Sequence, residues 1–266
     1  MYESYYGFTK TPFSKNISPS EFFAHAGHDE VLARLNYCVK ERAIGVLTGE
    51  VGAGKTLALR ALTSSLDQSR HTVVYFYGLA GLKGFYQTLI EALGDEPAFS
   101  HARLSAQTKA LISAEVEQKK KTLIIVLDEA HQASIELLEE LRLLTNDSMD
   151  SESLFALILA GQPTLRRKLH LTTLNALSQR VALRCRLSGF SLEETAGYIR
   201  HHLTRAGRSD AIFSDDAISS IYQSSNGTPR RINNTCTQAL IAGFLDSKSI
   251  IDEGTAKRAI AELAAD

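Results

Sequence analysis

Residues 49 to 56 read Gly-Glu-Val-Gly-Ala-Gly-Lys-Thr and match the phosphate-binding pattern G-x-x-x-x-G-K-[S/T] in full. The apolar run 44–47 precedes this stretch, and residues 57–66 follow it with helical spacing, so it links a buried strand to a helix. Backbone N–H groups of such a turn converge on a phosphate, and its glycines allow close approach. The sequence therefore predicts a site for a nucleoside triphosphate.

Each residue of this loop has an expected role in binding ATP. Lys55 is expected to reach the β- and γ-phosphates, and the Thr56 hydroxyl is expected to hold Mg²⁺. The other ATP-binding positions form the main-chain cradle: Gly49, Glu50, Val51, Gly52, Ala53 and Gly54.

A second candidate element is Leu-Ile-Ile-Val-Leu-Asp-Glu at 123–129. Five consecutive apolar residues predict a central parallel strand that is buried on both faces. Asp128 at its end is expected to hold Mg²⁺, directly or through water, and Glu129 to polarise the attacking water. An alternative is that Asp128 caps a helix that begins near Ala130. His131 is interpreted as part of a solvated helix start.

The composition is that of an ordinary globular protein. Of the 266 residues 44% are hydrophobic and 22% are charged, and the net charge of −1 gives no overall basic signal. Any contact with nucleic acid must therefore come from a local patch or from several subunits. The three cysteines lack metal-ligand spacing, and no metal beyond magnesium is expected. No run of 18 apolar residues and no signal-peptide core occur, so we expect a cytoplasmic protein without a membrane segment.

Strand-like and helix-like segments alternate along the first 188 residues, which predicts an α/β fold with a parallel sheet flanked by helices. The expected domains are an N-terminal arm and first helix packed on the core at 1–42, an α/β nucleotide domain at 43–188 and a small helical lid at 189–266. Further strands are expected at 72–77 and 154–159. Helices are expected at 31–41, 82–93, 104–118, 134–145, 192–206, 214–224, 230–244 and 254–264.

A phosphate loop, an Asp-Glu strand, a polar residue after the next strand and a helical lid together resemble an AAA+ ATPase. Over nearly the whole chain the sequence is similar to ExeA-type ATPases. That similarity rests on Tyr6-Gly7-Phe8, Pro12-Phe13, the Gly49-Glu50-Val51-Gly52 form of the loop, Ala160-Gly161-Gln162-Pro163, Ser178-Gln179-Arg180, Glu193-Glu194-Thr195 and Thr228-Pro229-Arg230. The group includes ATPases for secretion-complex assembly and ATPases encoded beside DDE transposases, and it is related to the TniB, TnsC and MuB transposition regulators.

The resemblance implies roles for two polar residues near the phosphates. Gln162 follows the strand expected beside the acidic one, where its amide would orient water or the γ-phosphate as sensor 1 does. The alternative for Gln162 is a Gln-Pro turn. Arg230 opens a lid helix and resembles sensor 2, and its neighbour Arg231 is an alternative for that role.

The resemblance also implies a homo-oligomer, a ring or a spiral, in which one subunit completes the site of the next. Arg180 is the candidate arginine finger that acts in trans on a neighbour's γ-phosphate. Arg184 and Arg186 alternate with it and remain competing candidates. For all these arginines the other interpretation is a surface salt bridge.

Contact with DNA rests on the weakest signal in the chain. Lys83 lies in the loop expected after the second strand, a region that faces the central channel in related spirals, and a solvated lysine is the alternative. The runs 119–121 and 166–168 are interpreted as a helix end and a subunit-interface helix. Aromatic residues of the N-terminal arm are expected to dock on the ATPase core or adenine pocket.

From these features we expect an ATP hydrolase that assembles on double-stranded DNA without sequence preference and guides a DDE transposase. The alternatives are an ATPase that assists assembly of a secretion complex in the cell envelope, and a nucleotide-dependent scaffold with negligible turnover. Secretion members of the group carry a membrane segment after the ATPase core, and no such segment occurs up to Asp266, which favours the transposition interpretation.

Overall fold

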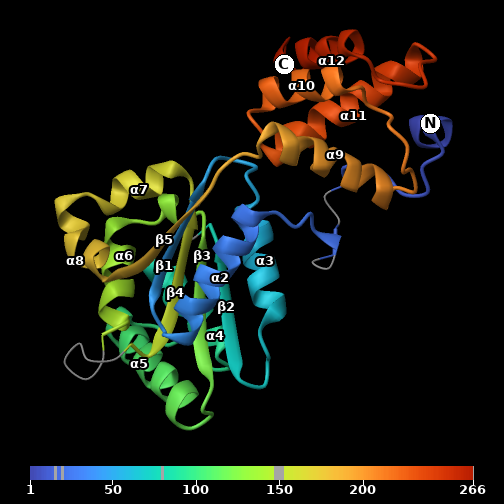
Figure 1. The fold of residues 1–266 in the computed structure, drawn as a ribbon. Helices are drawn as coiled ribbons and strands as arrows, with labels where there is room; N and C mark the ends of the chain where they lie inside the picture. Colours follow the sequence, from blue (N-terminus) through green and yellow to red (C-terminus); the bar gives the residue numbers. More distant parts are fainter. Residues whose placement is uncertain (15–16, 19–20, 79–80, 147–152, 266) are drawn as a thin grey trace. The chain divides into compact units, whose positions relative to one another are not determined.

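The computed structural model describes residues 1–14, 17–18, 21–78, 81–146 and 153–265 (Figure 1). Contacts between residues divide the chain into two compact units. Unit 1 comprises Met1–Ala26, Glu50–Gly54 and Ser188–Asp266, and unit 2 comprises Gly27–Gly49 and Lys55–Leu187. Each unit is described by itself.

Unit 2 is built on a five-stranded parallel sheet, as the sequence predicts (Figure 1). Its strands lie in the order β2-β3-β4-β1-β5. They are β1 (Ile44–Gly49), β2 (His71–Tyr77), β3 (Thr122–Asp128), β4 (Phe155–Gly161) and β5 (Val181–Leu187). The three central strands are almost entirely buried because they are covered on both faces, whereas β5 alternates buried and exposed residues, as an edge strand does.

The register of the strands determines which side chains meet at the carboxyl edge of the sheet. Asp128 at the end of β3 pairs with Tyr77 of β2, and Leu127 pairs with Leu159 of β4. On the other side of β4, Gly161 pairs with Thr48 of β1. The phosphate loop, the Asp-Glu pair and Gln162 therefore follow three adjacent strands, β1, β3 and β4, at one edge of the sheet.

Helices cover both faces of this sheet. One face carries the larger apolar core, in which Phe85, Leu89, Leu137 and Leu141 pack with alternate strand residues such as Ile125. The helices of unit 2 are α2 (Ala26–Lys40), α3 (Lys55–Ser65), α4 (Leu82–Ala92), α5 (His101–Glu117), α6 (Ile135–Leu144), α7 (Pro163–Leu169) and α8 (Asn175–Arg180). On the opposite face α2 approaches closely, since a Cβ on Gly45 would lie 2.9 Å from the Sγ atom of Cys38.

Unit 1 contains the C-terminal helical lid that the sequence predicts. Its helices are α9 (Leu192–Arg205), α10 (Asp215–Ser225), α11 (Pro229–Leu245) and α12 (Glu253–Ala265). Helix α9 begins with a capping box, in which the Ser191 and Glu194 side chains each accept a hydrogen bond from the other's main-chain N–H. These helices share one apolar core with aromatic residues of the N-terminal segment. No helix of the described residues is long and apolar enough to cross a membrane.

The N-terminal segment 1–26, with the short helix α1 (Tyr2–Tyr6), packs against the lid helices. The Tyr6 hydroxyl donates to the Lys248 carbonyl at 3.0 Å, and Thr9 Oγ1 donates to the Ala206 carbonyl at 3.2 Å. The Phe13 ring stacks on His202 with centroids 5.1 Å apart. The sequence grouped 1–42 as one arm on the ATPase core. The contacts instead divide this stretch after residue 26, because the aromatic residues of 1–26 pack on the apolar core of the lid helices.

Candidate nucleotide-binding site

The predicted phosphate loop connects β1 to α3 and has the backbone that its glycines allow. Gly52 and Gly54 have φ angles of 83° and 98°, a region that L-residues rarely adopt. Lys55 begins α3 and is 6% exposed, and its Nζ donates to the Gly49 carbonyl at 2.9 Å. The first N–H groups of α3 have no partner within the helix, which suits an anion at this position.

Within unit 1 the phosphate loop touches the start of α11. The Arg230 N–H donates to the Gly52 carbonyl at 3.3 Å, and a Cβ on Gly52 would lie only 2.5 Å from the Arg230 Cβ. Glycine at position 52 is therefore required for this approach as well as for its φ angle. The predicted sensor 2 residue is adjacent to the loop, and Arg230 and Arg231 are both exposed.

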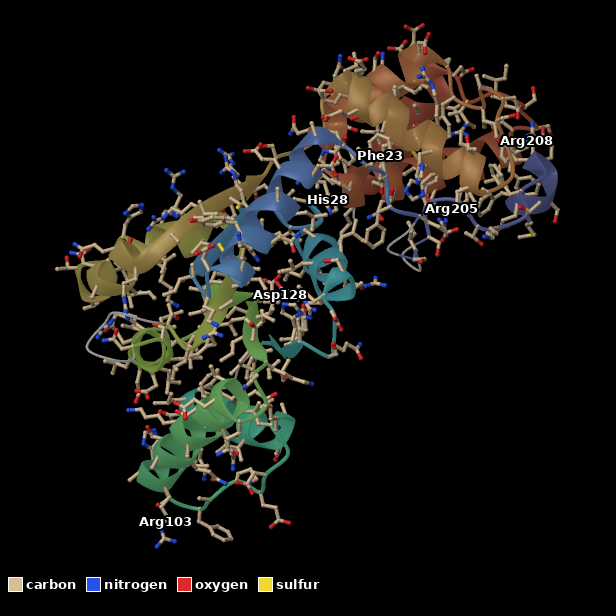
Figure 2. All side chains as sticks on the ribbon, turned by 60° about the horizontal axis from the view of Figure 1, so that its bottom comes forward. Phe23, His28, Arg103, Asp128, Arg205 and Arg208 are labelled. Atoms are coloured by element: carbon tan, nitrogen blue, oxygen red, sulfur yellow. The ribbon has the colours of Figure 1, made fainter. Side chains whose placement is uncertain are left out.

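Asp128 lies at the end of β3 (Figure 2), where its carboxylate accepts hydrogen bonds from three donors. Its Oδ2 accepts from Thr56 Oγ1 at 3.0 Å and from the Tyr75 hydroxyl at 2.6 Å, and its Oδ1 accepts from the Glu129 N–H at 2.9 Å. The residue is 1% exposed, so these bonds replace hydration of the carboxylate. Asp128 is not the N-cap of the helix that begins at Ala130, since that position is occupied by Glu129.

Tyr75 is a site residue that the sequence did not predict. Burial raises the pKa of its hydroxyl, and the hydrogen bond and negative charge of Asp128 raise that pKa further. In the register of β2 against β3, Asp128 pairs with Tyr77. Tyr75 lies two residues before Tyr77, so both tyrosines are on the same face of this edge strand. The signal in the sequence is the run of three aromatic residues that ends β2, Tyr75-Phe76-Tyr77, which by itself indicates only strand propensity.

Thr56 and Asp128 suit Mg²⁺, because a hydroxyl and a carboxylate are ligands that this ion prefers. The hydrogen bond between them brings residues from α3 and β3 together, although 72 positions separate them. In the structure these two residues would hold the ion beside the phosphate loop, where it would neutralise phosphate charge.

Glu129 and Gln162 follow adjacent strands, and His131 lies between them. Glu129 has a left-handed backbone with φ 56°, which turns the chain into the short helix η2 (Ala130–Gln132). The Nδ1 atom of His131 lies 3.4 Å from Glu129 Oε2 and accepts from the Gln162 N–H at 3.4 Å. The interpretation of His131 as part of a solvated helix start is therefore wrong, since its side chain is 13% exposed and contacts two predicted site residues.

The three candidate finger arginines differ in their surroundings. Arg180 ends α8 and donates through Nη1 to the Arg142 carbonyl at 3.1 Å and to Thr145 Oγ1 at 3.3 Å, at the end of α6. Burial lowers the pKa of Arg180, and the charge of Arg142 lowers it further. Arg184 is exposed and donates to Ser178, and Arg186 is also exposed. The finger role in trans stays a prediction for these three arginines.

The basic residues considered for DNA contact lie in unit 2, on α4, just after the end of α5 and on α7. Lys83 is exposed in the first turn of α4, so its placement in a loop was wrong. Lys119 pairs with Glu115 at 2.6 Å, consistent with a helix end. Lys168 on α7 donates to the carbonyls of His131 and Ala133, and burial lowers its pKa.

This α/β fold with its phosphate loop is that of the P-loop NTPases of the AAA+ class. Residues 39–169 match the family model described as an AAA domain. The chain is 33% identical over 252 residues to general secretion pathway protein A of Aeromonas hydrophila, which supports the ExeA-type resemblance. That alignment covers 92% of this chain and 45% of the relative, so the chain spans less than half of its length.

Three solved structures with a similar fold are distant from this chain in sequence. Cdc6p from Pyrobaculum aerophilum has a TM-score of 0.67 at 16% identity and covers 90% of this chain and 67% of its own. ORC2 of Aeropyrum pernix in its ADP form has a TM-score of 0.68 at 15% identity, and the match covers 94% of this chain and 71% of ORC2. The RuvB Holliday junction branch migration motor of Thermotoga maritima has a TM-score of 0.55 at 17% identity, and the match covers 90% of this chain and 70% of RuvB. These likenesses establish the fold alone.

Proposed function

We propose that this chain binds ATP with Mg²⁺ and hydrolyses it. The observation that carries the proposal is the bond of 3.0 Å between the Thr56 hydroxyl and the buried Asp128 carboxylate, beside a complete phosphate loop. The two oxygen ligands for the metal thus come from α3 and β3, and the lysine for the phosphates directly precedes the first of them in the chain. Glu129 follows Asp128 directly and is 21% exposed, which leaves its carboxylate accessible to water.

Each side chain has a distinct task in the proposed reaction. Lys55 would exchange its bond to the Gly49 carbonyl for a charge-assisted bond to the β- and γ-phosphates. Thr56 and Asp128 would hold Mg²⁺, which would supply neutralisation of phosphate charge. Glu129 would accept the proton of the attacking water, and the Gln162 amide would orient that water or the γ-phosphate.

Two substitutions test the assignment of ATP hydrolysis. Lys55→Ala is expected to abolish ATP binding, and Glu129→Gln to preserve binding while stopping phosphate release. The exposed residues Lys109 and Glu136 provide matched controls, Lys109→Ala and Glu136→Gln, which should behave as the wild type. Normal phosphate release by Glu129→Gln would falsify the catalytic assignment.

We also propose that ATP drives assembly of a homo-oligomer in which Arg180 acts on the neighbouring subunit. Specific activity should then rise with protein concentration, because an isolated monomer lacks the finger. Arg180→Ala should bind ATP, assemble poorly and lose this dependence. Thr145→Val is the control, since it removes one intramolecular bond of Arg180 and keeps the guanidinium. Equal losses in both variants would show that Arg180 acts only within its own chain.

Two cellular uses of the ATPase follow from different observations. The 33% identity to a general secretion pathway protein, over 92% of this chain, supports assistance to secretion-complex assembly. Regulation of a DDE transposase on double-stranded DNA is supported by the motif resemblance and by Lys83. A positive charge in the first turn of α4 opposes the helix dipole, so Lys83 does not serve helix stability. The first use has the stronger support, and for either use we propose that the ATPase acts in the cytoplasm.

Binding of random duplex DNA separates these uses. A DNA-based regulator should bind duplex when loaded with ATP, without sequence preference and with a steep loss of affinity as salt rises. Lys83→Ala should weaken binding to every sequence and reduce the salt slope, whereas Lys109→Ala should not. An ATP-assembled oligomer that fails to bind duplex at low salt would leave secretion-complex assembly as the use.

A further inference from the structure

The turn that follows β3 carries His131 back toward the end of the neighbouring strand β4. Glu129 has φ 56° and ψ 32°, and the chain then forms the single turn of η2. A non-glycine residue in this conformation is strained by about 1–2 kcal/mol, so the surrounding contacts must hold it. One such contact is the bond from the Glu129 N–H to Asp128 Oδ1 at 2.9 Å.

Two features fix the turn against β4 and α7. Gly161 leaves room for His131, because a Cβ there would lie 3.2 Å from the His131 main-chain nitrogen and 3.3 Å from its Nδ1. The Lys168 ammonium donates to the carbonyls of His131 and Ala133, which ties α7 to this turn. A displacement of the junction between β4 and α7 would therefore move the imidazole as well.

The Nδ1 atom of His131 faces two groups that it cannot satisfy together. It accepts from the Gln162 N–H, which requires a lone pair, and it lies 3.4 Å from Glu129 Oε2, which requires a proton on the same atom. When Nδ1 carries a lone pair, it accepts the hydrogen bond from the Gln162 N–H and cannot donate to the Glu129 carboxylate. When Nδ1 carries a proton, it can donate to that carboxylate and no longer accepts from the Gln162 N–H.

We infer that His131 is a positioning residue that couples the backbone at Gln162 to the orientation of Glu129. The inference rests on the proposed function, in which Gln162 lies by the γ-phosphate and Glu129 acts as the base. A change at the β4–α7 junction would reach Glu129 through one ring nitrogen. His131 contacts neither nucleotide nor water in this role, so it affects turnover and leaves affinity for ATP unchanged.

Three substitutions distinguish the role of Nδ1 from the bulk of the ring. Asparagine places a polar atom at the δ position, glutamine places its polar atoms one bond further out, and phenylalanine keeps the ring without nitrogen. His131→Phe and His131→Gln should lower kcat about 10- to 100-fold, the usual effect of misplacing a catalytic group. His131→Asn should stay within about threefold of the wild type, because it retains the δ contact.

The measurements are phosphate release at saturating MgATP, the Kd of a fluorescent ATP analogue and the thermal midpoint of each variant. The inference is supported if kcat falls in His131→Phe and His131→Gln while the Kd and the thermal midpoint stay at the wild-type values. It is overturned if His131→Phe has wild-type kcat, if asparagine and glutamine give equal losses, or if Kd weakens in proportion to kcat. The Glu129→Gln variant is measured alongside, since its activity tests the proposed function separately.

Discussion

The hydroxyl of Tyr75 gives a direct measure of how strongly the buried carboxylate of Asp128 is held. Tyr75→Phe removes only the donor of the 2.6 Å bond to Asp128 Oδ2. A hydrogen bond to an ionised group contributes about 1.5–3 kcal/mol. Because Tyr75 is 39% exposed and water replaces part of the bond, we expect a loss of about 1–2 kcal/mol. That loss lowers the thermal midpoint by about 2–8 °C for a chain of this size.

The pH dependence of this loss has a fixed sign. The Tyr75 pKa is raised in the folded state, so its contribution is present in full below the ordinary tyrosine pKa of about 10. The contribution disappears as pH rises through the folded pKa. The difference in unfolding free energy between wild type and Tyr75→Phe should therefore be constant from pH 6 to 9 and shrink above about pH 10.

Urea unfolding at several pH values, together with Mg²⁺ titration of nucleotide binding, provides the assay. Groups that orient a metal ligand affect metal affinity about 10- to 100-fold, so the half-saturating Mg²⁺ concentration should rise about 10-fold. Tyr77→Phe is the matched control, because Tyr77 lies on the same face of β2 and is 73% exposed. Equal stability and equal Mg²⁺ dependence in the wild type and Tyr75→Phe would refute the reasoning.

Three further outcomes are expected. Gly52→Ala should weaken ATP binding at least tenfold in a titration, because it adds about 1–2 kcal/mol of left-handed backbone strain and places a Cβ 2.5 Å from the Arg230 Cβ. The control Gly84→Ala should leave ATP binding unchanged, because a Cβ at that position meets open space. Burial, with His201 and Arg205 nearby, lowers the pKa of His202 to about 3, so the unfolded chain binds the extra proton. Stability should then fall below pH 6.5, by about 2 kcal/mol at pH 5, and His202→Phe should flatten that slope in acid unfolding. Cys38, Cys185 and Cys236 are buried free thiols, so a thiol reagent should label them only as the protein unfolds, and rapid labelling of the native protein would contradict this.

The parts of the fold that the sequence predicted are those with a local signal. The phosphate loop is continuous in sequence, and β3 and β4 are unbroken apolar runs, so both their existence and their buried position could be inferred. Strand β5 was not expected as a strand. Arg184 and Arg186 alternate there with buried residues, and this pattern belongs to an edge strand whose outer side is solvated.

The missed parts of the site depend on contacts between strands. Tyr75 reaches Asp128 because of the β2–β3 register, and His131 reaches Gln162 because Glu129 adopts a left-handed conformation. Neither the register nor the turn has a signature in neighbouring residues. The aromatic residues of the N-terminal segment were recognised as anchors, but their docking surface is formed by residues about 200 positions later, which local patterns cannot reveal.

The attachment of the N-terminal segment to the lid has a consequence for synthesis of the chain. Tyr6 bonds the carbonyl of a residue 242 positions later, and Thr9 bonds one 197 positions later. Segment 1–26 thus leaves the ribosome about 10–50 s before the helices on which it docks, at ordinary rates of translation. During that interval the aromatic residues of segment 1–26 are exposed. Contacts of such high sequence separation also form late in folding, so the segment is expected to be a site of chaperone binding on the nascent chain.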